Sequence, residues 1–473
     1  MFWTFANYIL EWVICLGMLL VVPRRRNPTS AVAWLLVVFL LPHLGLVLYL
    51  MIGENWLPRR RTKRIARLLH EGQSIRRRFR GHPSMVRPHL SPELTSAVTL
   101  AERLGFLPIL GGNDVELMTE TDQVIDRLID DIEGARHHVH LLFYIFAADA
   151  TGRRVADALA RAVERGVHCR VLVDSVGSAR MVKRLAPEML GRGIEVHEAL
   201  PVGLFRRRAS RFDLRNHRKL AVIDGRIGYT GSQNIVDASY GHKDLAWHDI
   251  MARITGPVVL ELQAVFLSDW YHETDELLDS DEIFPEPTTT GSVAIQTLPS
   301  GPAYPTENYQ RMVVAALHGA RRHVIITTPY FVPDEPFLQA MQVAVLRGVP
   351  VELIVPERYD QIVVGAASRS YYDDLLEHGV RVHLYQSGLL HSKTMTIDGE
   401  VAFLGTSNFD IRSFALNFEL NLVLYDAEVA GRLAAEQRRY IADSLPLERD
   451  AWNRRRWSHK VFQNVARLFS PLL

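Results

Sequence analysis

Cysteine is almost absent from this sequence, which has only Cys15 and Cys169 among its 473 residues. Two cysteines, the first inside an apolar segment, argue against a disulfide framework and exclude a zinc cluster built on cysteine. A large net charge is absent too, because 54 Lys and Arg residues balance 53 Asp and Glu residues and leave +1. The chain is longer than one hydrophobic core usually supports, so we expect two domains with appendages.

Acidic residues are missing from most of residues 59–80, where ten Lys and Arg residues accompany Glu71 alone. The basic charge of the chain is therefore concentrated locally. Beside an apolar segment, such a cluster is expected to contact anionic lipid at about 1 kcal/mol per basic residue. A solvated basic tail is the alternative interpretation.

Charge is missing again from residues 30–52, apart from the titratable His43. This run is long enough to cross roughly 30 Å of hydrocarbon as a helix, so it predicts a transmembrane span. Pro42, near its middle, allows a kink or a break. Residues 2–22 are long enough as well but carry Glu11, and they predict either a second span or a helix lying in the membrane surface.

Basic residues near these segments predict the orientation of the chain. The cluster at residues 59–80 places the remainder of the chain on the cytoplasmic side. Arg24, Arg25 and Arg26 favour the opposite orientation if both segments span, but the larger cluster carries more weight. We expect a membrane anchor at residues 1–58 and a basic juxtamembrane linker at residues 59–108.

The rest of the chain can be laid over itself. Each copy has an apolar strand (residues 137–146 and 322–332), a helical pattern (155–174 and 337–356), a short strand (193–199 and 379–385) and a shared motif. This alternation predicts one α/β domain in each half, at residues 109–278 and 293–450, joined by an acidic linker at residues 279–292. The expected fold class is α/β: two homologous domains related by a pseudo-twofold axis, with an N-terminal transmembrane helical anchor.

An insertion distinguishes the two copies. Gly193 and His217 are 24 residues apart (217 − 193), whereas Gly379 and His391 are 12 apart (391 − 379), so the first half is longer. The extra residues, 200–215, mix apolar side chains with clustered arginines. They suit a loop that dips into an anionic interface beside the active site, and an ordinary exposed loop is the alternative.

The C-terminal segment, residues 451–473, is basic and amphipathic. Phe462, Val465 and Phe469 fall at helical spacing, with Trp457 among basic residues. Docking at a membrane interface and packing back on the second domain are equally compatible with this pattern.

The shared motif reads HRKLAVIDGRIGYTGSQN from His217 and HSKTMTIDGEVAFLGTSN from His391. In both copies a lysine follows the histidine by two residues, and an asparagine follows it by 17 (234 − 217 and 408 − 391). His and Lys two apart share one face of a strand. The Asp-Gly pair that follows predicts a hairpin, whose returning strand brings the asparagine and a hydroxyl back beside them. The converging residues are His217, Lys219, Ser232 and Asn234 in the first copy and His391, Lys393, Thr406 and Asn408 in the second.

Such a cluster suits chemistry on a phosphodiester. Lysine and amide donors can hold the nonbridging oxygens and stabilise the charge that develops on attack. One imidazole can attack phosphorus to form a phosphohistidine, while a second imidazole on the opposite side protonates the leaving alcohol. Two homologous halves supply the two histidines. The scheme requires no metal or other cofactor, and the motifs lack a carboxylate cluster suited to magnesium.

The two copies resemble the paired H-K-D signatures of the phospholipase D superfamily. Within it, the N-terminal apolar segments, PSGP at residues 299–302 and NFDIRSFALNFEL at residues 408–420 are similar to bacterial cardiolipin synthases. The resemblance covers nearly the whole chain.

The resemblance implies a role for each motif residue. His217 and His391 would be the nucleophile and the general acid, with His217 preferred as the nucleophile. The remaining residues of the implied catalytic and substrate-binding set are Lys219, Lys393, Asp224, Asp398, Asn234, Asn408, Ser232 and Thr406. Within this set, the aspartates Asp224 and Asp398 are expected to brace the strands and lysines rather than to do chemistry.

Two further pairs complete the implied site. Glu419 resembles the family's carboxylate that holds the other nitrogen of a catalytic histidine. In the first half Asp249 is the nearest candidate, although it lies four residues later in register. Tyr144 and Tyr330 end equivalent strands and either line the cavity or belong to the core.

The implied activity is that of a phosphatidyltransferase that makes cardiolipin and glycerol from two molecules of phosphatidylglycerol. Phosphatidylglycerol and anionic membrane lipids would be the partners, with no nucleic acid. The implied location is the bacterial inner membrane, with the catalytic domains facing the cytoplasm. A membrane-bound phospholipase D-type hydrolase would use the same residues, whereas a nuclease should show a long basic groove with stacking aromatics. An inactive scaffold is the third alternative, but both histidines and both lysines are intact.

Overall fold

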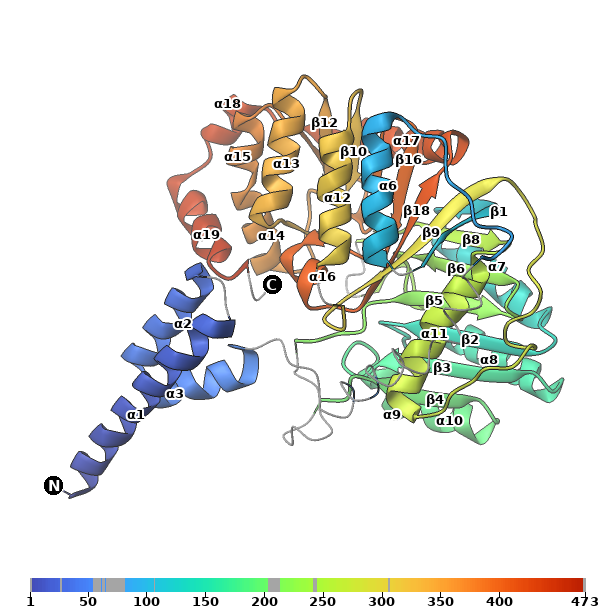
Figure 1. Ribbon diagram of the computed structural model, residues 1–473, viewed down its shortest axis with the longest axis horizontal. Coiled ribbons are helices and arrows are strands. Elements are labelled where there is room, and N and C mark those ends of the chain that lie inside the picture. The colour runs from blue at the N-terminus through green and yellow to red at the C-terminus, as the bar shows by residue number, and fades with distance from the viewer. Residues whose placement is uncertain are drawn as a thin grey trace. The chain divides into compact units, whose positions relative to one another are not determined.

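The computed structural model (Figure 1) describes residues 2–25, 28–53, 61, 64, 81–105, 107–202, 213–240, 245–304 and 307–470. The chain forms two compact units. The N-terminal unit comprises residues 1–58 with 202–213, and the main unit comprises residues 59–201 with 214–473. Most of the basic cluster at residues 59–80 and most of the insertion at residues 200–215 lie outside the described residues. The lipid contacts expected of these two segments therefore stay predictions.

The N-terminal unit consists of the helices α1 (Phe2–Arg25), α2 (Pro28–Leu40) and α3 (Pro42–Leu48), followed by the π-helix η1 (Tyr49–Gly53). Within the described part of the chain, one helix is long and apolar enough to cross a membrane, and it covers Trp3–Arg24. Glu11 does not interrupt it, because the carboxylate accepts a 2.8 Å hydrogen bond from Asn7 one turn earlier.

Residues 30–52, predicted to be a transmembrane span, form two shorter apolar helices with the break that Pro42 allows. The helix breaks at Leu41, whose φ of −138° and ψ of 74° are not helical. The cause is Pro42, since proline lacks the N–H that would continue the helix and disfavours helical angles at the preceding residue. Residues 2–22, predicted to be either a second span or a surface helix, therefore lie in the helix that is long enough to cross a membrane.

The main unit is built on a single 15-stranded sheet to which both halves of the chain contribute (Figure 1). Its order is β19 (Ser444–Pro446), β13 (Arg381–Tyr385), β12 (Val351–Pro356), β10 (Val324–Thr327), β15 (Thr394–Ile397), β16 (Val401–Gly405), β18 (Glu419–Tyr425), β9 (Val293–Ser300), β1 (Ile109–Met118), β8 (Met251–Thr255), β6 (Ile227–Gly231), β5 (Lys219–Ile223), β2 (His138–Phe143), β3 (His168–Asp174) and β4 (Glu195–Ala199).

The strand order confirms the predicted duplication. Towards the centre of the sheet, the first half reads β4-β3-β2-β5-β6-β8-β1 and the second reads β13-β12-β10-β15-β16-β18-β9, so these seven strands of each half correspond one to one. The edge strand β19, which pairs with β13, has no counterpart among the described strands of the first half. The first three strands in each of these orders are parallel, and the inner ones are antiparallel. The halves meet where β1 pairs with β9, with Ile109 opposite Gln296. The two predicted α/β domains thus share one sheet.

Helices cover the sheet and bury its apolar side chains. They are α7 (Thr121–Glu133), α8 (Ala150–Glu164), α9 (Ala179–Arg184), α10 (Ala186–Gly191) and α11 (Val259–Thr274) in the first half, and α12 (Asn308–Gly319), α13 (Glu335–Leu346), α14 (Ile362–Ser370), α15 (Tyr372–Glu377), α16 (Ile411–Ala415) and α17 (Ala427–Ala442) in the second. One buried cluster joins side chains of both halves, including Leu220 and Val222 with Leu404 and Leu422. The halves therefore do not have fully separate cores.

The two helical patterns are shorter than the sequence predicted. The helices α8 and α13 end at Glu164 and Leu346, and the residues that follow turn into β3 and β12. Gly166 and Gly348 stand at these turns with φ of 89° and 86°, a left-handed conformation that glycine adopts without steric cost. The apolar runs after each glycine are buried strands rather than further helical turns.

Part of the predicted juxtamembrane linker is a helix of the main unit. The helix α6 (Pro92–Gly105) packs beside α12 of the second half, as Figure 1 shows. Its buried residues Leu94, Ala97 and Ala101 join the core of that half. Residues 92–105 are thus structural rather than a flexible connection.

Close backbone packing explains a glycine that both motif copies share. Gly231 ends β6 and Gly405 ends β16, each against the neighbouring strand β8 or β18. A Cβ atom on Gly231 would lie 2.2 Å from the carbonyl oxygen of Ile250, and one on Gly405 would lie 2.5 Å from that of Leu420. Any side chain would push these strands apart.

We therefore expect Gly405→Ala to lower the free energy of unfolding by about 1–3 kcal/mol, the usual range for overpacking. Gly431→Ala is the matched control, because nothing lies within 4 Å of a Cβ built on Gly431 in α17. That change should raise stability by about 0.5–1 kcal/mol through helix propensity. Denaturant unfolding in detergent measures both, and equal effects would contradict the packing argument.

Candidate active site

The histidines of the two motif copies line a single cavity. This cavity has a volume of about 480 Å³, and His217 and His391 both belong to its wall. Asn234, Asn408, Tyr144 and Tyr330 line it as well. The structure therefore brings the two motifs together. Of the two roles predicted for Tyr144 and Tyr330, it shows them lining the cavity.

Backbone hydrogen bonds between the halves hold the two histidines in place. The His217 N–H donates to the carbonyl of Phe418 over 2.9 Å, and the His391 N–H donates to that of His248 over 2.8 Å. Next to the second bond, the short strand β14 (Leu389–Leu390) pairs with β7 (Trp247–His248) of the other half. The backbone of each histidine is thus bonded to the residue that directly precedes a carboxylate residue, Glu419 or Asp249, of the opposite half.

These carboxylates, Glu419 and Asp249, bind the histidine rings crosswise. The Nδ1 atom of His217 lies 2.9 Å and 3.0 Å from the two carboxylate oxygens of Glu419, and the Nδ1 atom of His391 lies 2.6 Å from Oδ1 of Asp249. Because an ionised carboxylate only accepts, Nδ1 carries the hydrogen and Nε2 keeps the lone pair of a neutral imidazole. Asp249 and Glu419 hold equivalent positions despite the shift in register.

The motif hydroxyls support the carboxylates. Ser232 donates to Asp249 over 2.6 Å, and Thr406 donates to Glu419. Both hydroxyl side chains are fully buried. This placement corrects the prediction that Ser232 and Thr406 bind substrate, because each hydroxyl hydrogen is already directed at a carboxylate.

Burial determines the charge of the site before any ligand arrives. It lowers the pKa of His217 to about 4 and that of His391 to about 3, although the carboxylate beside each ring acts in the opposite direction. Burial would raise the pKa of Asp249 and Glu419, but the adjacent histidines hold the pKa of Asp249 at about 2 and that of Glu419 below its usual value. At neutral pH both imidazoles are neutral and both carboxylates are ionised.

The motif lysines lie beside the histidines rather than on the cavity wall. Lys219 donates to the carbonyl of His217 over 2.8 Å, and Lys393 to that of His391 over 2.6 Å. Burial lowers the pKa of Lys219 to about 8 and that of Lys393 well below its ordinary value. Both lysines are buried, and among the described residues neither belongs to the cavity lining. Their contribution to the site is a positive potential and a fixed histidine backbone.

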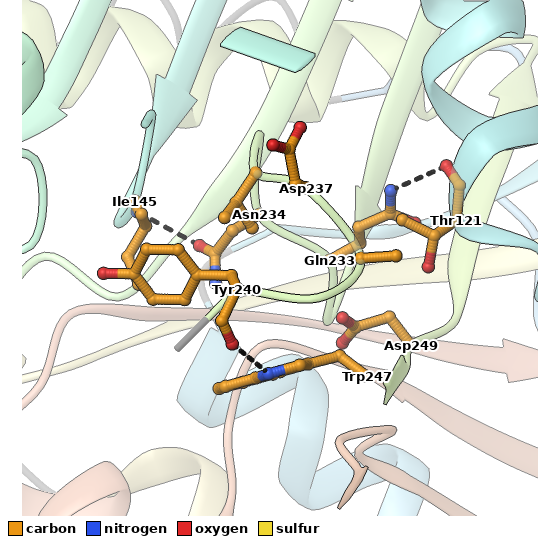
Figure 2. A pocket seen from close by; sticks show the side chains of 10 residues that line it. Thr121, Ile145, Gln233, Asn234, Asp237, Tyr240, Trp247 and Asp249 are labelled. Carbon is orange, nitrogen blue, oxygen red and sulfur yellow. Dashed lines mark hydrogen bonds between the residues drawn. The ribbon is translucent and has the colours of Figure 1, made fainter. Parts of the chain in front are cut away.

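The two asparagines differ in orientation. The side-chain carbonyl of Asn234 accepts a 3.1 Å bond from the Ile145 N–H, so its NH₂ group is the donor that remains for a ligand (Figure 2). The Asn408 amide nitrogen instead donates to Asp410 over 3.0 Å. Figure 2 shows the side chains that line a second, small cavity. Its volume is about 10 Å³, and Asn234 and Trp247 line both this cavity and the main one.

The motif aspartates lie at the far end of their strands from the histidines. Asp224 accepts from the N–H groups of residues 136, 137 and 138 over 2.8, 2.8 and 3.0 Å, and Asp398 accepts from those of residues 321, 322 and 323. Both have positive φ, 52° and 56°, in the tight turn that the Asp-Gly pairs predict. They brace the turn and the start of β2 or β10, and they make no bond to the lysines.

Sequence reasoning missed several residues of the cavity wall, among them Trp247, Asn417, Arg215, Arg412 and Asp410. Trp247 packs edge-on against the ring of His391 with centroids 4.7 Å apart, as Tyr144 packs against His217 at 4.8 Å. A signal for two of them was available. When residues 247–249 (WHD) are aligned with residues 417–419 (NFE), Asp249 matches Glu419. The residue two positions before each carboxylate is then Trp247 in one half and Asn417 in the other.

Comparisons with known proteins agree with this arrangement. A family model described as "Cardiolipin synthase, PLD-like domain" matches residues 128–270 and 313–441, and one described as "Phospholipase_D-nuclease N-terminal" matches residues 12–54. The chain is 38% identical to cardiolipin synthase A of Pectobacterium carotovorum subsp. carotovorum, over 100% of this chain and 99% of that protein. It is 39% identical to cardiolipin synthase A of Yersinia pseudotuberculosis, over 98% and 97%.

A solved structure shows the same fold. The phosphatidylserine synthase of Haemophilus influenzae matches with a TM-score of 0.63, covering 80% of this chain and 100% of its own. Its sequence identity is 14%, so this likeness concerns the fold alone.

The depressed pKa of His217 predicts a pH dependence of stability. Since the folded pKa of about 4 lies below the unfolded value, the contribution of this histidine is present above about pH 6.5 and is lost as the pH falls towards 4. His217→Gln should therefore reduce the slope of unfolding free energy against pH in this window by about 1.4 kcal/mol per pH unit. His459→Gln, a change at an exposed residue, is the control. Urea unfolding at several pH values measures the slope, and equal slopes in the two variants would contradict the assignment.

Proposed function

The chain belongs to the cardiolipin synthase family of phospholipase D-like proteins, and from this premise we propose that it makes cardiolipin and glycerol from two molecules of phosphatidylglycerol. The observation that carries the proposal is the pair of imidazoles in one cavity, each held at Nδ1 by a carboxylate of the opposite half. Such a pair can serve one phosphorus atom from two sides. The chain is a membrane-associated phosphatidyltransferase.

In the first step, Nε2 of one neutral histidine attacks the phosphorus of the donor phosphatidylglycerol. A bond forms between nitrogen and phosphorus, and the bond from phosphorus to the glycerol headgroup oxygen breaks. The second histidine gives its proton to that oxygen, so glycerol leaves as a neutral alcohol. We assign His217 as the nucleophile and His391 as the acid.

In the second step, the headgroup hydroxyl of another phosphatidylglycerol attacks the phosphohistidine. His391, now neutral, takes the hydroxyl proton, and the bond between nitrogen and phosphorus breaks. The product is cardiolipin, and both histidines return to their starting state. Since burial keeps both imidazoles neutral in the free site, the acid must take up its proton when the anionic phosphodiester binds and raises its pKa.

The surrounding residues support these steps by electrostatics. The buried lysines Lys219 and Lys393 provide a positive potential, and the Asn234 amide is a donor for a nonbridging oxygen. The carboxylates Glu419 and Asp249 stabilise an imidazolium at Nδ1 as it forms, as the aspartate does in a serine protease triad. Asp224 and Asp398 have no role in this scheme beyond bracing the turns.

The membrane arrangement is part of the proposal. The apolar helix α1 supports association with a membrane. We place the main unit at the cytoplasmic face of the bacterial inner membrane, because the basic residues at 59–80 follow the anchor. Phosphatidylglycerol would reach the cavity from the adjacent leaflet.

The product assay tests the reaction. Purified protein given phosphatidylglycerol alone should release glycerol and cardiolipin in equal amounts. His217→Ala and His391→Ala should each lower the rate by on the order of 10³-fold or more, because both steps use both rings. His459→Ala, outside the cavity, is the control and should retain the rate. Phosphatidic acid as the main product would indicate the phospholipase D-type hydrolase instead, and a near wild-type rate in either cavity variant would end the two-histidine scheme.

A leaving-group experiment tests which histidine is the nucleophile. A phosphatidyl ester of p-nitrophenol needs no proton for departure, because its leaving group is a weak base. His391→Asn should therefore keep a burst of p-nitrophenol, whereas His217→Asn should lose it by on the order of 10³-fold. The reverse pattern would exchange the two roles and leave the overall reaction unchanged.

A further inference from the structure

The C-terminal helix α19 (Trp457–Arg467) is amphipathic in an unusual way. Side chains on a helix repeat every 3.6 residues, and here they divide into three sectors. Gln463 and Ala466 are buried against the main unit, and Lys460 lies in a polar sector. A third sector is apolar and exposed. From the sequence, this segment could either dock at a membrane interface or pack on the second domain. The helix α19 has one surface suited to each.

The helix α19 packs against α14, on which Ile362 is a further exposed apolar side chain. We name the exposed apolar side chains of these two packed helices the α14–α19 face and define it by Ile362, Trp457, Val461, Phe462, Val465 and Leu468. All six side chains are exposed, and Ile362, Trp457 and Leu468 are each at least 76% exposed. Exposed apolar side chains gathered on neighbouring helices mark sites of interaction.

The helix α19 is fixed to the main unit. Arg455 forms an ion pair with Asp373 in the first turn of α15, and Arg467 reaches Asp374 of the same turn over 3.1 Å. The Arg467 guanidinium also lies 4.3 Å from the centre of the Tyr371 ring. The orientation of the α14–α19 face is therefore defined by the fold of the main unit.

The α14–α19 face begins at the rim of the catalytic cavity. Asp360, Gln361 and Val364 line that cavity, and the exposed Ile362 lies between them in sequence. A surface that covered this face would lie directly beside the cavity mouth. If the substrate is a phospholipid, the natural occupant of such a surface is the lipid bilayer itself.

Charge on the same segment favours an anionic bilayer. Residues 451–470 contain five Lys and Arg residues and no Asp or Glu. Arg455 and Arg467 pair with Asp373 and Asp374, so the charge offered to lipid is that of Arg454, Arg456 and Lys460. Basic residues around an apolar helix face are typical of helices that lie in the headgroup region of anionic membranes.

We propose that the α14–α19 face docks on the anionic leaflet and brings the cavity mouth to the lipid headgroups. The proposal rests on the proposed function for the identity of the substrate, but docking can be measured without turnover. Apolar side chains of α19 enter the interface, Arg454, Arg456 and Lys460 pair with lipid phosphates, and phosphatidylglycerol passes along α14 into the cavity.

Site-specific quenching tests the docking directly. Both native cysteines are buried, so a fluorophore can be attached at Val461→Cys or Val465→Cys in the full chain. His459→Cys is the control, because this exposed residue lies outside the apolar sector at helical spacing. In phosphatidylglycerol vesicles, brominated acyl chains should quench the label at 461 and 465 about threefold more strongly than at 459. Equal quenching at the three positions would overturn the proposal. So would labels at 461 and 465 that are shielded in detergent without lipid, because the N-terminal helices or a second copy would then cover the face.

A charge substitution links docking to turnover. The double variant Val461→Glu with Val465→Glu should lower the ratio of activity on vesicles to activity on detergent-dispersed phosphatidylglycerol by about tenfold, because two carboxylates would enter the interface. His459→Glu, outside the apolar sector, should leave that ratio unchanged. An unchanged ratio in the double variant would overturn the proposal. A wild-type protein that docks but makes no cardiolipin would overturn the proposed function instead.

Discussion

The crossed pairs between histidine and carboxylate are the interaction on which the rest of this site depends. His217 is held by Glu419 and His391 by Asp249, so neither half contains a complete set of catalytic groups. Ionised carboxylates buried as deeply as these are stable only if they find hydrogen-bond partners, which the Nδ1–H groups of the two imidazoles provide. The strand pairing of β1 with β9 and the backbone bonds at Phe418 and His248 hold the halves in the one register that allows this.

The same constraint explains why the two motif copies resemble each other so closely. Every group has a counterpart in the other half: a lysine on the histidine carbonyl, a hydroxyl on the carboxylate, a glycine where two strands approach. The copies differ where the reaction would need asymmetry. Tyr144 contacts one imidazole and Trp247 the other, and the two asparagine amides are oriented differently.

Much of this could be predicted from the sequence, because the signals were local. The hairpin turns followed from Asp-Gly, the strand faces from the two-residue spacing of His and Lys, and the duplication from equal offsets. The predictions were wrong where an apolar run carries no local signal that distinguishes a strand from a helix. Residues 168–174 and 351–356 look like continued helix until the preceding glycine turns the chain. The break at Pro42, in contrast, could be anticipated from the proline itself.

The sequence by itself determined the fold class, the duplication and the identity of the two histidines, since each of these is written as a repeated spacing. Tertiary structure alone decided which carboxylate serves which histidine, that Ser232 and Thr406 support carboxylates rather than substrate, and that α19 turns an apolar sector outward. The choice of carboxylate depends on contacts between residues far apart in the chain, 202 residues for His217 and Glu419 and 142 residues for His391 and Asp249. No local pattern encodes these contacts, because they are set by how two halves close on one sheet.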